Sequence, residues 1–351
     1  MTAWPSHLPA ARGAVLALAA AGLFGISTPL VQRAGAGLGP FETAALLYAG
    51  AAALGACMRQ PVEREAALRA GDLPRLVCMA LFGAGLGPVA LAWGLQRTSG
   101  TSASLMLTLE ALFTALLAWV LYRETMDRRV RAAMTLLVAG GIVLVLDRGS
   151  AAGAQWIGLL AVLGATVAWG IDNTLSRAVA ERDPGRVVLA KSALGAAATG
   201  ALAAAFAEPW PHAGAALALL AIGAGGYGLS LRLYLLAQRA FGAARTGSVF
   251  AFAPFIGAVL ALALGDRSAT WGMGLGGALM LAGVVLHLSE SHAHEHVHEA
   301  LEHEHAHVHD DGHHDHVHDP MPTGPHSHHH RHEPLQHAHP HVPDAHHTHR
   351  H

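Results

Sequence analysis

Long apolar stretches separated by short polar connections dominate the first 289 residues of the chain. A helix that crosses a bilayer needs roughly 20 predominantly apolar residues. Ten stretches approach this length, at 13–34, 41–58, 74–95, 102–122, 130–146, 156–176, 187–207, 214–236, 246–264 and 271–288. The pattern therefore predicts an all-α integral membrane body with ten transmembrane helices.

The body also repeats itself with an offset near 143 residues, which indicates an internal duplication. The matching segments are 24–28 with 169–173, 83–85 with 223–225, 96–97 with 238–239, 110–113 with 253–256, and 139–143 with 282–285. Each copy holds five predicted spans, and an odd number inserts the second copy upside down. We therefore predict one five-helix repeat at 1–147 and an inverted one at 148–289.

Composition separates this body from a polar tail at 290–351. Over the whole chain 52% of residues are hydrophobic and 13% are charged, whereas a soluble domain carries about a quarter charged residues. The net charge of −2 hides a body that carries an excess of seven basic residues and a tail that carries an excess of nine acidic ones.

No nucleotide-binding loop stands out, which disfavours an ATP-driven pump. Cys57 and Cys78 have no partner nearby in the sequence and are expected to act as small packing residues.

The basic residues lie mainly on alternate connections, and this predicts the orientation in the membrane. The expected inner set is Arg59, Arg64, Arg69, Arg75, Arg123, Arg128, Arg129, Arg131, Arg177, Arg182, Arg186, Lys191, Arg239 and Arg245. The expected outer connections carry only Arg33, Arg97, Arg148 and Arg267, and Trp156, Trp210 and Trp271 fall at the outer boundary. We expect a multi-pass protein of the bacterial inner membrane with both termini in the cytoplasm.

One motif near the end of the first repeat resembles a known family. Leu109-Glu110-Ala111-Leu112-Phe113, followed by Glu124, is similar to the end-of-repeat pattern of the EamA-type permeases of the drug/metabolite transporter superfamily. The second copy has Ala253-Pro254 at this place, so it lacks the acid. The resemblance covers the body and none of the tail. It implies a permease fold and the export of amino acids, drugs or other metabolites, or the exchange of sugar phosphates.

Two glycine-rich segments occupy matching places in the third and eighth spans, 83–88 and 223–228. Inverted-repeat transporters bind substrate near the midplane at such interrupted helices. The predicted pathway residues here are Gly85, Gly87, Gly225 and Tyr227. Close helix packing explains the same glycines and is compatible with a substrate role.

Ionisable residues inside the predicted spans are the other candidates, because each costs roughly 2.5–3.5 kcal/mol on insertion scales. Glu110 is the first candidate for substrate contact or proton coupling. Asp172 and Arg232 are also placed in the pathway, together with Asn173, the polar neighbour of Asp172. The alternatives are a helix-to-helix hydrogen bond for Glu110 and an interfacial pair with Arg177 for Asp172. Lys191 and Arg232 are long enough to extend to the cytoplasmic surface.

The tail holds 24 of the 27 histidines and too few apolar residues to bury a core, so it is expected to be disordered. Histidines at i and i+2 point to the same side of an extended chain, and neutral imidazole suits Zn, Ni, Co and Cu. The candidate ligands are His292, His294, His296, His298, His303, His305, His307, His309, His313, His314, His316, His318, His328, His329 and His330. The alternative is a tail that buffers protons, since free His titrates near pH 6.5.

Together these features predict a secondary transporter that exports a small metabolite or amino-acid-like solute by alternating access and binds metal with its tail. The alternatives are a divalent transition-metal (Zn, Ni or Co) exporter and a membrane-anchored metal sensor or store. No enzyme activity and no required cofactor are expected. The expected partners are the solute, the lipid bilayer, protons as coupling ion and a second copy in a homodimer, with no nucleic acid.

Overall fold

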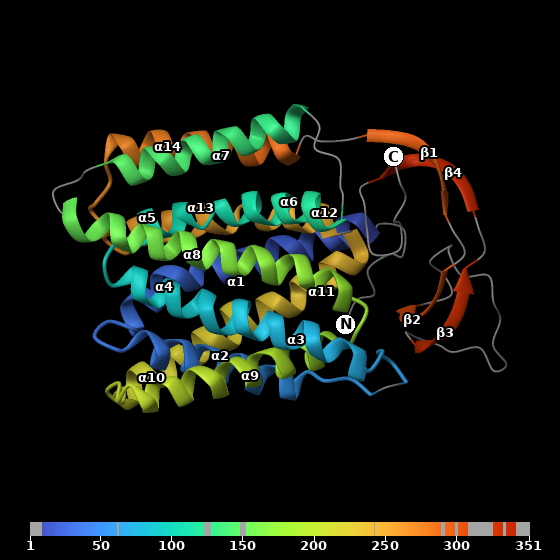
Figure 1. Cartoon of the computed structure of the whole chain (residues 1–351), viewed down its shortest axis with the longest axis horizontal. Coiled ribbons are helices and arrows are strands. Elements are labelled where there is room, and N and C mark those ends of the chain that lie inside the picture. The colour runs from blue at the N-terminus through green and yellow to red at the C-terminus, as the bar shows by residue number, and fades with distance from the viewer. Residues whose placement is uncertain are drawn as a thin grey trace.

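The computed structural model describes residues 9–61, 63–122, 128–147, 152–241, 243–288, 292–298, 301–307, 326–332 and 335–341. The described body is a bundle of helices that run roughly along one direction (Figure 1). Its first half comprises α1 (Pro9–Ala34), α2 (Pro40–Cys57), η1 (Ala70–Asp72), α3 (Leu73–Met79), η2 (Ala80–Leu86), α4 (Gly87–Leu95), α5 (Gly100–Met106), α6 (Leu109–Tyr122) and α7 (Arg128–Leu146). The second half comprises α8 (Ala152–Ser176), η3 (Arg177–Val179), α9 (Pro184–Ala205), α10 (Ala213–Ile222), η4 (Gly223–Leu229), α11 (Ser230–Phe241), α12 (Ala243–Phe250), α13 (Ala253–Ala263) and α14 (Trp271–Leu288).

Eight helical segments of the described body are long and apolar enough to cross a membrane. They are Arg12–Ala34, Ala70–Leu95, Gly100–Leu121, Arg128–Leu146, Gln155–Val179, Pro184–Ala205, Ala213–Ala240 and Thr246–Ala263. Trp271–His287 is apolar but shorter, and α2 occupies the place of the second predicted span. A multi-pass, all-helical membrane body is confirmed, while the count of ten spans stays a prediction.

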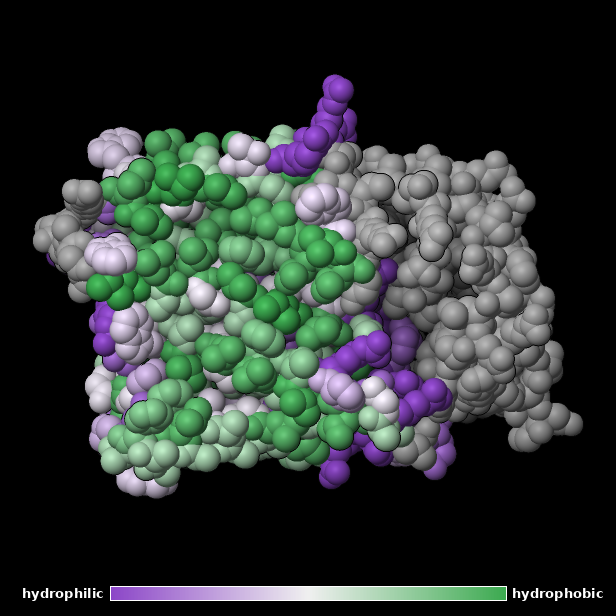
Figure 2. Space-filling view, in the orientation of Figure 1, coloured by the Kyte–Doolittle hydropathy of each residue, from purple (hydrophilic) through white to green (hydrophobic). Residues whose placement is uncertain are grey.

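The outer surface of the bundle is apolar, as a lipid-facing surface requires. Figure 2 shows hydrophobic residues over most of the visible face of the helices and hydrophilic residues toward its ends. Large apolar side chains on this surface include Leu217 and Val259, which are 66% and 67% exposed. Cys57 and Cys78, which were expected to act as small packing residues, are also exposed on the bundle. A thiol is apolar enough to face lipid, so the residue type alone does not predict burial.

Corresponding helices of the two halves pack against each other at opposite sides of the bundle, α2 on α9 and α7 on α14 (Figure 1). The α7–α14 contact is reciprocal. A Cβ added at Gly140 would lie 2.7 Å from the backbone oxygen of Gly276, and one at Gly283 would lie 2.9 Å from that of Ala133. Glycine in these places lets the two backbones approach closely. Gly140 and Gly283 are related by the same offset as Ala133 and Gly276, so one contact is repeated.

Ion pairs join the two halves at one end of the bundle. Arg182, beyond η3, pairs with Asp72 of η1 at 2.9 Å, and Arg239 of α11 pairs with Glu65 at 2.8 Å. Burial raises the pKa of Glu65, and the guanidinium of Arg239 opposes that shift. These contacts hold the connection before η1 against the second half.

Asp266, between α13 and α14, holds the start of α5. Its carboxylate accepts hydrogen bonds from the amide nitrogen of Thr101 at 2.9 Å and from its hydroxyl at 2.8 Å, and also from Ser268. Burial raises the pKa of Asp266, but these hydrogen bonds outweigh it and lower the pKa below its usual value. The carboxylate therefore contributes stability in its ionised form.

Acid should weaken this contact in a defined pH window. Because the folded-state pKa of Asp266 is lowered, its contribution is fully present above the unfolded value of about 3.9 and is lost as pH falls through the folded value. We expect the melting temperature of the Asp266→Asn variant to be lower than that of the wild type at pH 6, with the difference shrinking below pH 4. A difference that stays constant down to pH 3 would contradict the assignment.

Four strands lie beyond one end of the bundle in Figure 1: β1 (His292–His298), β2 (Leu301–His307), β3 (His326–His332) and β4 (Leu335–His341). They form two antiparallel pairs, β1 with β4 and β2 with β3. The sequence predicts disorder for the tail, and these segments differ from that prediction. Alternating histidine matches the two-residue period of a strand, and strand pairing satisfies the backbone without a hydrophobic core.

Candidate substrate site

The two glycine-rich segments form matching π-helical turns, η2 in the first half and η4 in the second. Both turns continue into α-helix on either side, so the predicted interruption takes the form of a wider turn and not a break. A π-turn replaces i→i+4 hydrogen bonds by i→i+5 bonds and is frequent at functional sites. A Cβ added at Gly83 would lie 2.3 Å from the carboxyl carbon of Asp172, so only glycine lets η2 approach α8 this closely.

The backbone oxygen of Gly83 collects two side chains from other helices. The indole Nε1 of Trp169 on α8 donates a hydrogen bond to it at 3.0 Å, and the hydroxyl of Tyr48 on α2 donates another. Both side chains are buried, with exposed fractions of 4% and 3%. The π-turn of the first half is thereby connected to helices of both halves.

Asp172 and Lys191 form a buried ion pair beside η2. The ammonium of Lys191 on α9 contacts Oδ2 of Asp172 on α8, and the two residues are 3% and 4% exposed. Lys191 lies seven residues into α9, about 10 Å along the axis from Pro184. The expectations that Lys191 extends to the surface and that Asp172 pairs with Arg177 are therefore wrong. A carboxylate on the adjacent helix holds the ammonium inside the bundle.

Glu110 and Asn173 form the second polar contact. The amide Nδ2 of Asn173 on α8 donates a hydrogen bond to Oε1 of Glu110, which is 8% exposed. The predicted single helix at 102–122 is interrupted by a turn at Leu107-Thr108, so Glu110 lies in the first turn of α6. The second half is interrupted at the corresponding place, between α12 and α13. A helix N-terminus stabilises a carboxylate, so the family motif places its acid where the backbone favours it.

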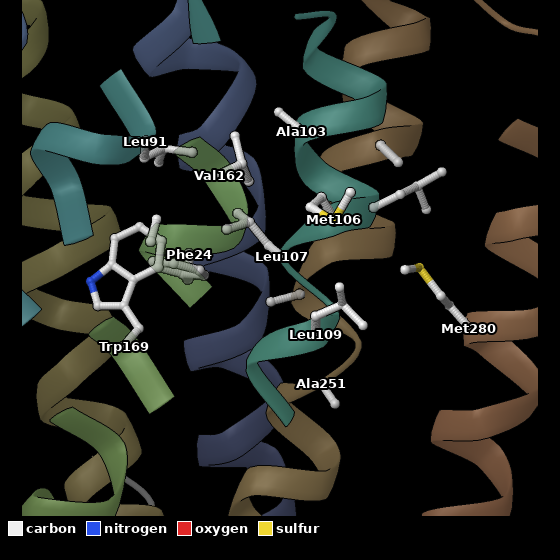
Figure 3. Close-up of a cluster of buried hydrophobic side chains, with 14 of the residues drawn as sticks. Phe24, Leu91, Ala103, Met106, Leu107, Leu109, Val162, Trp169, Ala251 and Met280 are labelled. Carbon is white, nitrogen blue, oxygen red and sulfur yellow. The ribbon is translucent and has the colours of Figure 1, made fainter. Parts of the chain in front are cut away.

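A cluster of aromatic side chains adjoins these polar contacts. The ring of Phe24 on α1 lies 5.4 Å from that of Trp169 and 5.7 Å from that of Tyr227 on η4, both edge to face. The rings of Tyr48 and Tyr227 lie 5.4 Å apart. Figure 3 shows Phe24 and Trp169 side by side within the surrounding apolar core. Tyr227 is thus buried among these rings, and its place in the pathway stays a prediction.

The other predicted pathway residues are distributed less closely. A Cβ at Gly87 would lie 2.7 Å from Nε1 of Trp169, so Gly87 packs on the same indole. A Cβ at Gly225 would have no neighbour within 4 Å, and one at Gly85 would meet only Ala80. Arg232 is partly buried on α11, and its Nη1 has no hydrogen-bond partner in the described part of the chain. The structure therefore brings together Glu110, Asn173, Asp172 and Tyr227, and adds Tyr48, Trp169 and Lys191, which the sequence analysis did not select.

The sequence contains only weak indications that Lys191, Trp169 and Tyr48 belong to the site. Lys191 is the single lysine of the chain and lies within an otherwise apolar stretch. Trp169 stands in the Trp169-Gly170-Ile171-Asp172-Asn173 segment that repeats the one at 24–28, and Tyr48 lies inside the second predicted span.

The predicted metal ligands lie partly outside the described residues. His309, His313, His314, His316 and His318 are outside them, as is Glu124 of the family motif. His292, His294, His296 and His298 lie on β1, His303, His305 and His307 on β2, and His328, His329 and His330 on β3. Among the described residues, no group of three His, Cys, Asp or Glu side chains is placed to hold a metal ion. The metal-binding tail stays a prediction.

Comparison with known proteins places the body among transporters. The model of the EamA-like transporter family matches residues 11–146 and again residues 156–289. An uncharacterized transporter of Methanothermobacter thermautotrophicus is 26% identical over 235 residues, which cover 64% of this chain and 67% of that protein. A crystal structure described simply as that of a protein has a TM-score of 0.58 at 21% identity, covering 78% of this chain and 94% of the other. That likeness concerns the fold.

Proposed function

Because this chain belongs to the EamA-like transporter family, we propose that it exports a small metabolite or amino-acid-like solute across the bacterial inner membrane. The family assigns it to membrane transporters and not to enzymes. The resemblance drawn from the Leu109–Phe113 motif is thereby confirmed. The substrate, the direction and the cellular membrane belong to the proposal.

The observation that carries the proposal is the polar cluster enclosed between the halves. Glu110 comes from the first half, and Asn173, Asp172 and Lys191 come from the second. Ionisable side chains inside a membrane body are expensive and typically mark a substrate or ion pathway. The π-turns η2 and η4 adjoin this cluster and its aromatic neighbours in corresponding places.

Alternating access by two inverted repeats is the mechanism that we propose for this arrangement. Two successive family matches and the pairing of corresponding helices support it. In this mechanism one half rocks against the other around the central site. The ion pairs Asp72–Arg182 and Glu65–Arg239 would separate when the end that they hold opens.

We propose that Glu110 carries the coupling proton. Its carboxyl group faces an amide, whereas that of Asp172 faces an ammonium, so Glu110 gains less from staying ionised than Asp172 does. A carboxyl that alternates between ionised and neutral forms would link solute movement to the proton gradient.

Uptake into inside-out membrane vesicles tests the proposal. Vesicles containing the full chain should accumulate a member of a panel of radiolabelled amino acids and aromatic metabolites when a pH gradient is imposed. Glu110→Gln should lower the gradient-driven uptake by about tenfold or more, because glutamine keeps the shape but cannot exchange a proton. Glu63→Gln, which changes an exposed glutamate, is the control and should transport normally. Equal uptake by the two variants would exclude Glu110 as the coupling group.

A second candidate function, export of a divalent transition metal, is favoured by the register of the tail strands. On β1 and β4 the paired residues include His292 with His341, His294 with His339 and His296 with His337. On β2 and β3 they include His303 with His330, His305 with His328 and His307 with His326. Neutral imidazole suits Zn, Ni and Co, so pairing histidine with histidine in the register concentrates this type of ligand.

The same vesicles separate this candidate from the first. If the chain exports metal, radiolabelled zinc, nickel or cobalt will be taken up, less so by Glu110→Gln and less so by a chain ending at residue 289. Metal that binds the full chain without any flux would make the tail regulatory and leave solute export as the function. A metal phenotype that depends on the tail alone and is insensitive to Glu110→Gln would indicate a membrane-anchored sensor or store.

A further inference from the structure

The central cluster contains two carboxyl groups and one ammonium, and this imbalance suggests what it transports. Glu110, Asp172 and Lys191 are the formally charged side chains of the cluster. Tyr48 on α2 reaches Gly83 beside the ion pair, and its ring lies 5.4 Å from that of Tyr227 on η4. With both carboxyl groups ionised, the cluster lacks one positive charge. It therefore favours a cation over a neutral or anionic solute.

Only one of the two carboxylate oxygens of Asp172 has a partner among the described residues. Its Oδ2 contacts the ammonium of Lys191, whereas its buried Oδ1 accepts no hydrogen bond from the described residues. A buried acceptor without a donor is costly, and a native structure usually keeps one for a reason. The carboxylate faces Gly83 of η2, the π-turn of the opposite half. A relative movement of the halves therefore changes what covers Asp172.

A buried ion pair is weak support for a purely structural role. Replacing such a pair by apolar side chains of similar size is often neutral or stabilising. The ammonium of Lys191 is on a flexible four-carbon stem, so it can leave a carboxylate without movement of α9. The rings of Trp169 and Tyr48 meet at Gly83 beside the pair, and aromatic faces attract cations.

We propose that Lys191 is a tethered substitute for the transported cation. In the state described here its ammonium occupies the cation position on Asp172, and a cationic solute replaces it there during the transport cycle. The return of Lys191 to Asp172 then expels the solute when the site opens to the other side. This inference rests on the proposed transport function and assigns a class of substrate to the same site.

The single lysine makes the replacement measurable in the wild-type protein. A lysine nitrogen buried against a carboxylate is shielded from reagents, whereas a released lysine amine attacks an acetylating N-hydroxysuccinimide ester, forming an amide and releasing N-hydroxysuccinimide. The full chain in lipid nanodiscs would be treated with this reagent, and acetylation of Lys191 would be followed by peptide mass spectrometry. The α-amino group of residue 1 is the internal control.

Three additions decide the outcome: phenyltrimethylammonium, its uncharged isostere tert-butylbenzene, and nickel chloride. We expect a cation to accelerate acetylation of Lys191 by about tenfold or more, because displacement from Asp172 exposes the side-chain nitrogen to the reagent. The uncharged isostere should leave the rate of Lys191 acetylation unchanged. None of the three additions should change the rate of acetylation at residue 1. Acceleration by the organic cation alone indicates an amine-type solute, and acceleration by nickel alone indicates a metal.

The proposal is overturned if neither cation changes the rate, or if tert-butylbenzene changes it equally. In folded Asp172→Asn protein, Lys191 should react fast with or without a cation. If vesicles export a neutral or anionic solute while Lys191 stays unresponsive, the transport function stands and the inference fails. If Lys191 responds to a cation but no solute crosses the membrane, the proposed transport function fails, while the exchange of Lys191 for a cation on Asp172 stands.

Discussion

Replacing Gly223 with alanine should sharply reduce the amount of folded protein, because the space for the methyl group is occupied by backbone. The added Cβ would lie 1.9 Å from the carbonyl oxygen of Leu47 and 2.6 Å from its carbonyl carbon. If the neighbouring atoms belonged to a side chain, that side chain could rotate away from the new methyl group. They belong to the backbone of α2, which cannot. Overpacking costs about 1–3 kcal/mol and more where main chains must separate. We expect this loss because η4 and α2 are forced apart.

Gly225→Ala is the matched control two residues further along the same π-turn. A Cβ at Gly225 would meet nothing within 4 Å, so its methyl group is tolerated. Alanine also favours a helix over glycine by up to about 1 kcal/mol. Gel filtration after a series of heating steps measures both variants. Similar melting temperatures for the two variants would show that η4 and α2 are further apart at Gly223 than in the structure.

Asp172→Asn should destabilise the protein as strongly as any single change in the central cluster. The substitution leaves the Lys191 ammonium buried at 3% exposure without its counter-charge. Breaking a buried pair by removing one partner typically costs about 3–5 kcal/mol. Lys191→Met removes the other partner and should be costly for the same reason. The double change Asp172→Asn/Lys191→Met removes both charges and should recover most of the stability.

The pair of Arg186 with Asp183, in which the arginine reaches the surface and hydrogen bonds from Gln60 and Gly185 also satisfy the carboxylate, provides the comparison. Its nitrogen-to-oxygen distance is 3.4 Å and the arginine side chain is 36% exposed, so Arg186→Ala should cost at most about 1 kcal/mol. Heating the four variants and the wild type under one condition completes the cycle. Losses that add in the double variant, or single losses no larger than that of Arg186→Ala, would contradict a buried ion pair.

The helical body was predictable because the length of an apolar stretch is a strong constraint in a membrane. The ten predicted segments each coincide with helix in the structure, and Gly83 and Gly223 begin the glycine-rich runs that become π-turns. The burial of Glu110 was predictable because this residue stands within a long apolar stretch, and a carboxyl group there calls for a reason. A family motif at the same place strengthened that choice.

The partner of an ionisable residue was not predictable in the same way. Lys191 looked like one of the basic residues of an inner connection, since it is close in sequence to Arg182 and Arg186. Counting charges along the chain cannot show that Asp172 lies opposite it on the neighbouring helix. The turn at Leu107-Thr108 was missed for a related reason, because no proline or glycine marks it and tertiary packing decides it.

The pairing of α2 with α9 and of α7 with α14 has a consequence for the history of the molecule. Contacts between equivalent elements of two copies are characteristic of a two-fold homodimer. Reciprocal contacts such as Gly140 with Gly276 and Ala133 with Gly283 are what such a dimer would leave behind after its genes fused. The two halves are then joined by an interface older than the connection between Asp147 and Ala152. An ancestral chain that corresponded to one of the two matched regions would then have needed no covalent link to assemble.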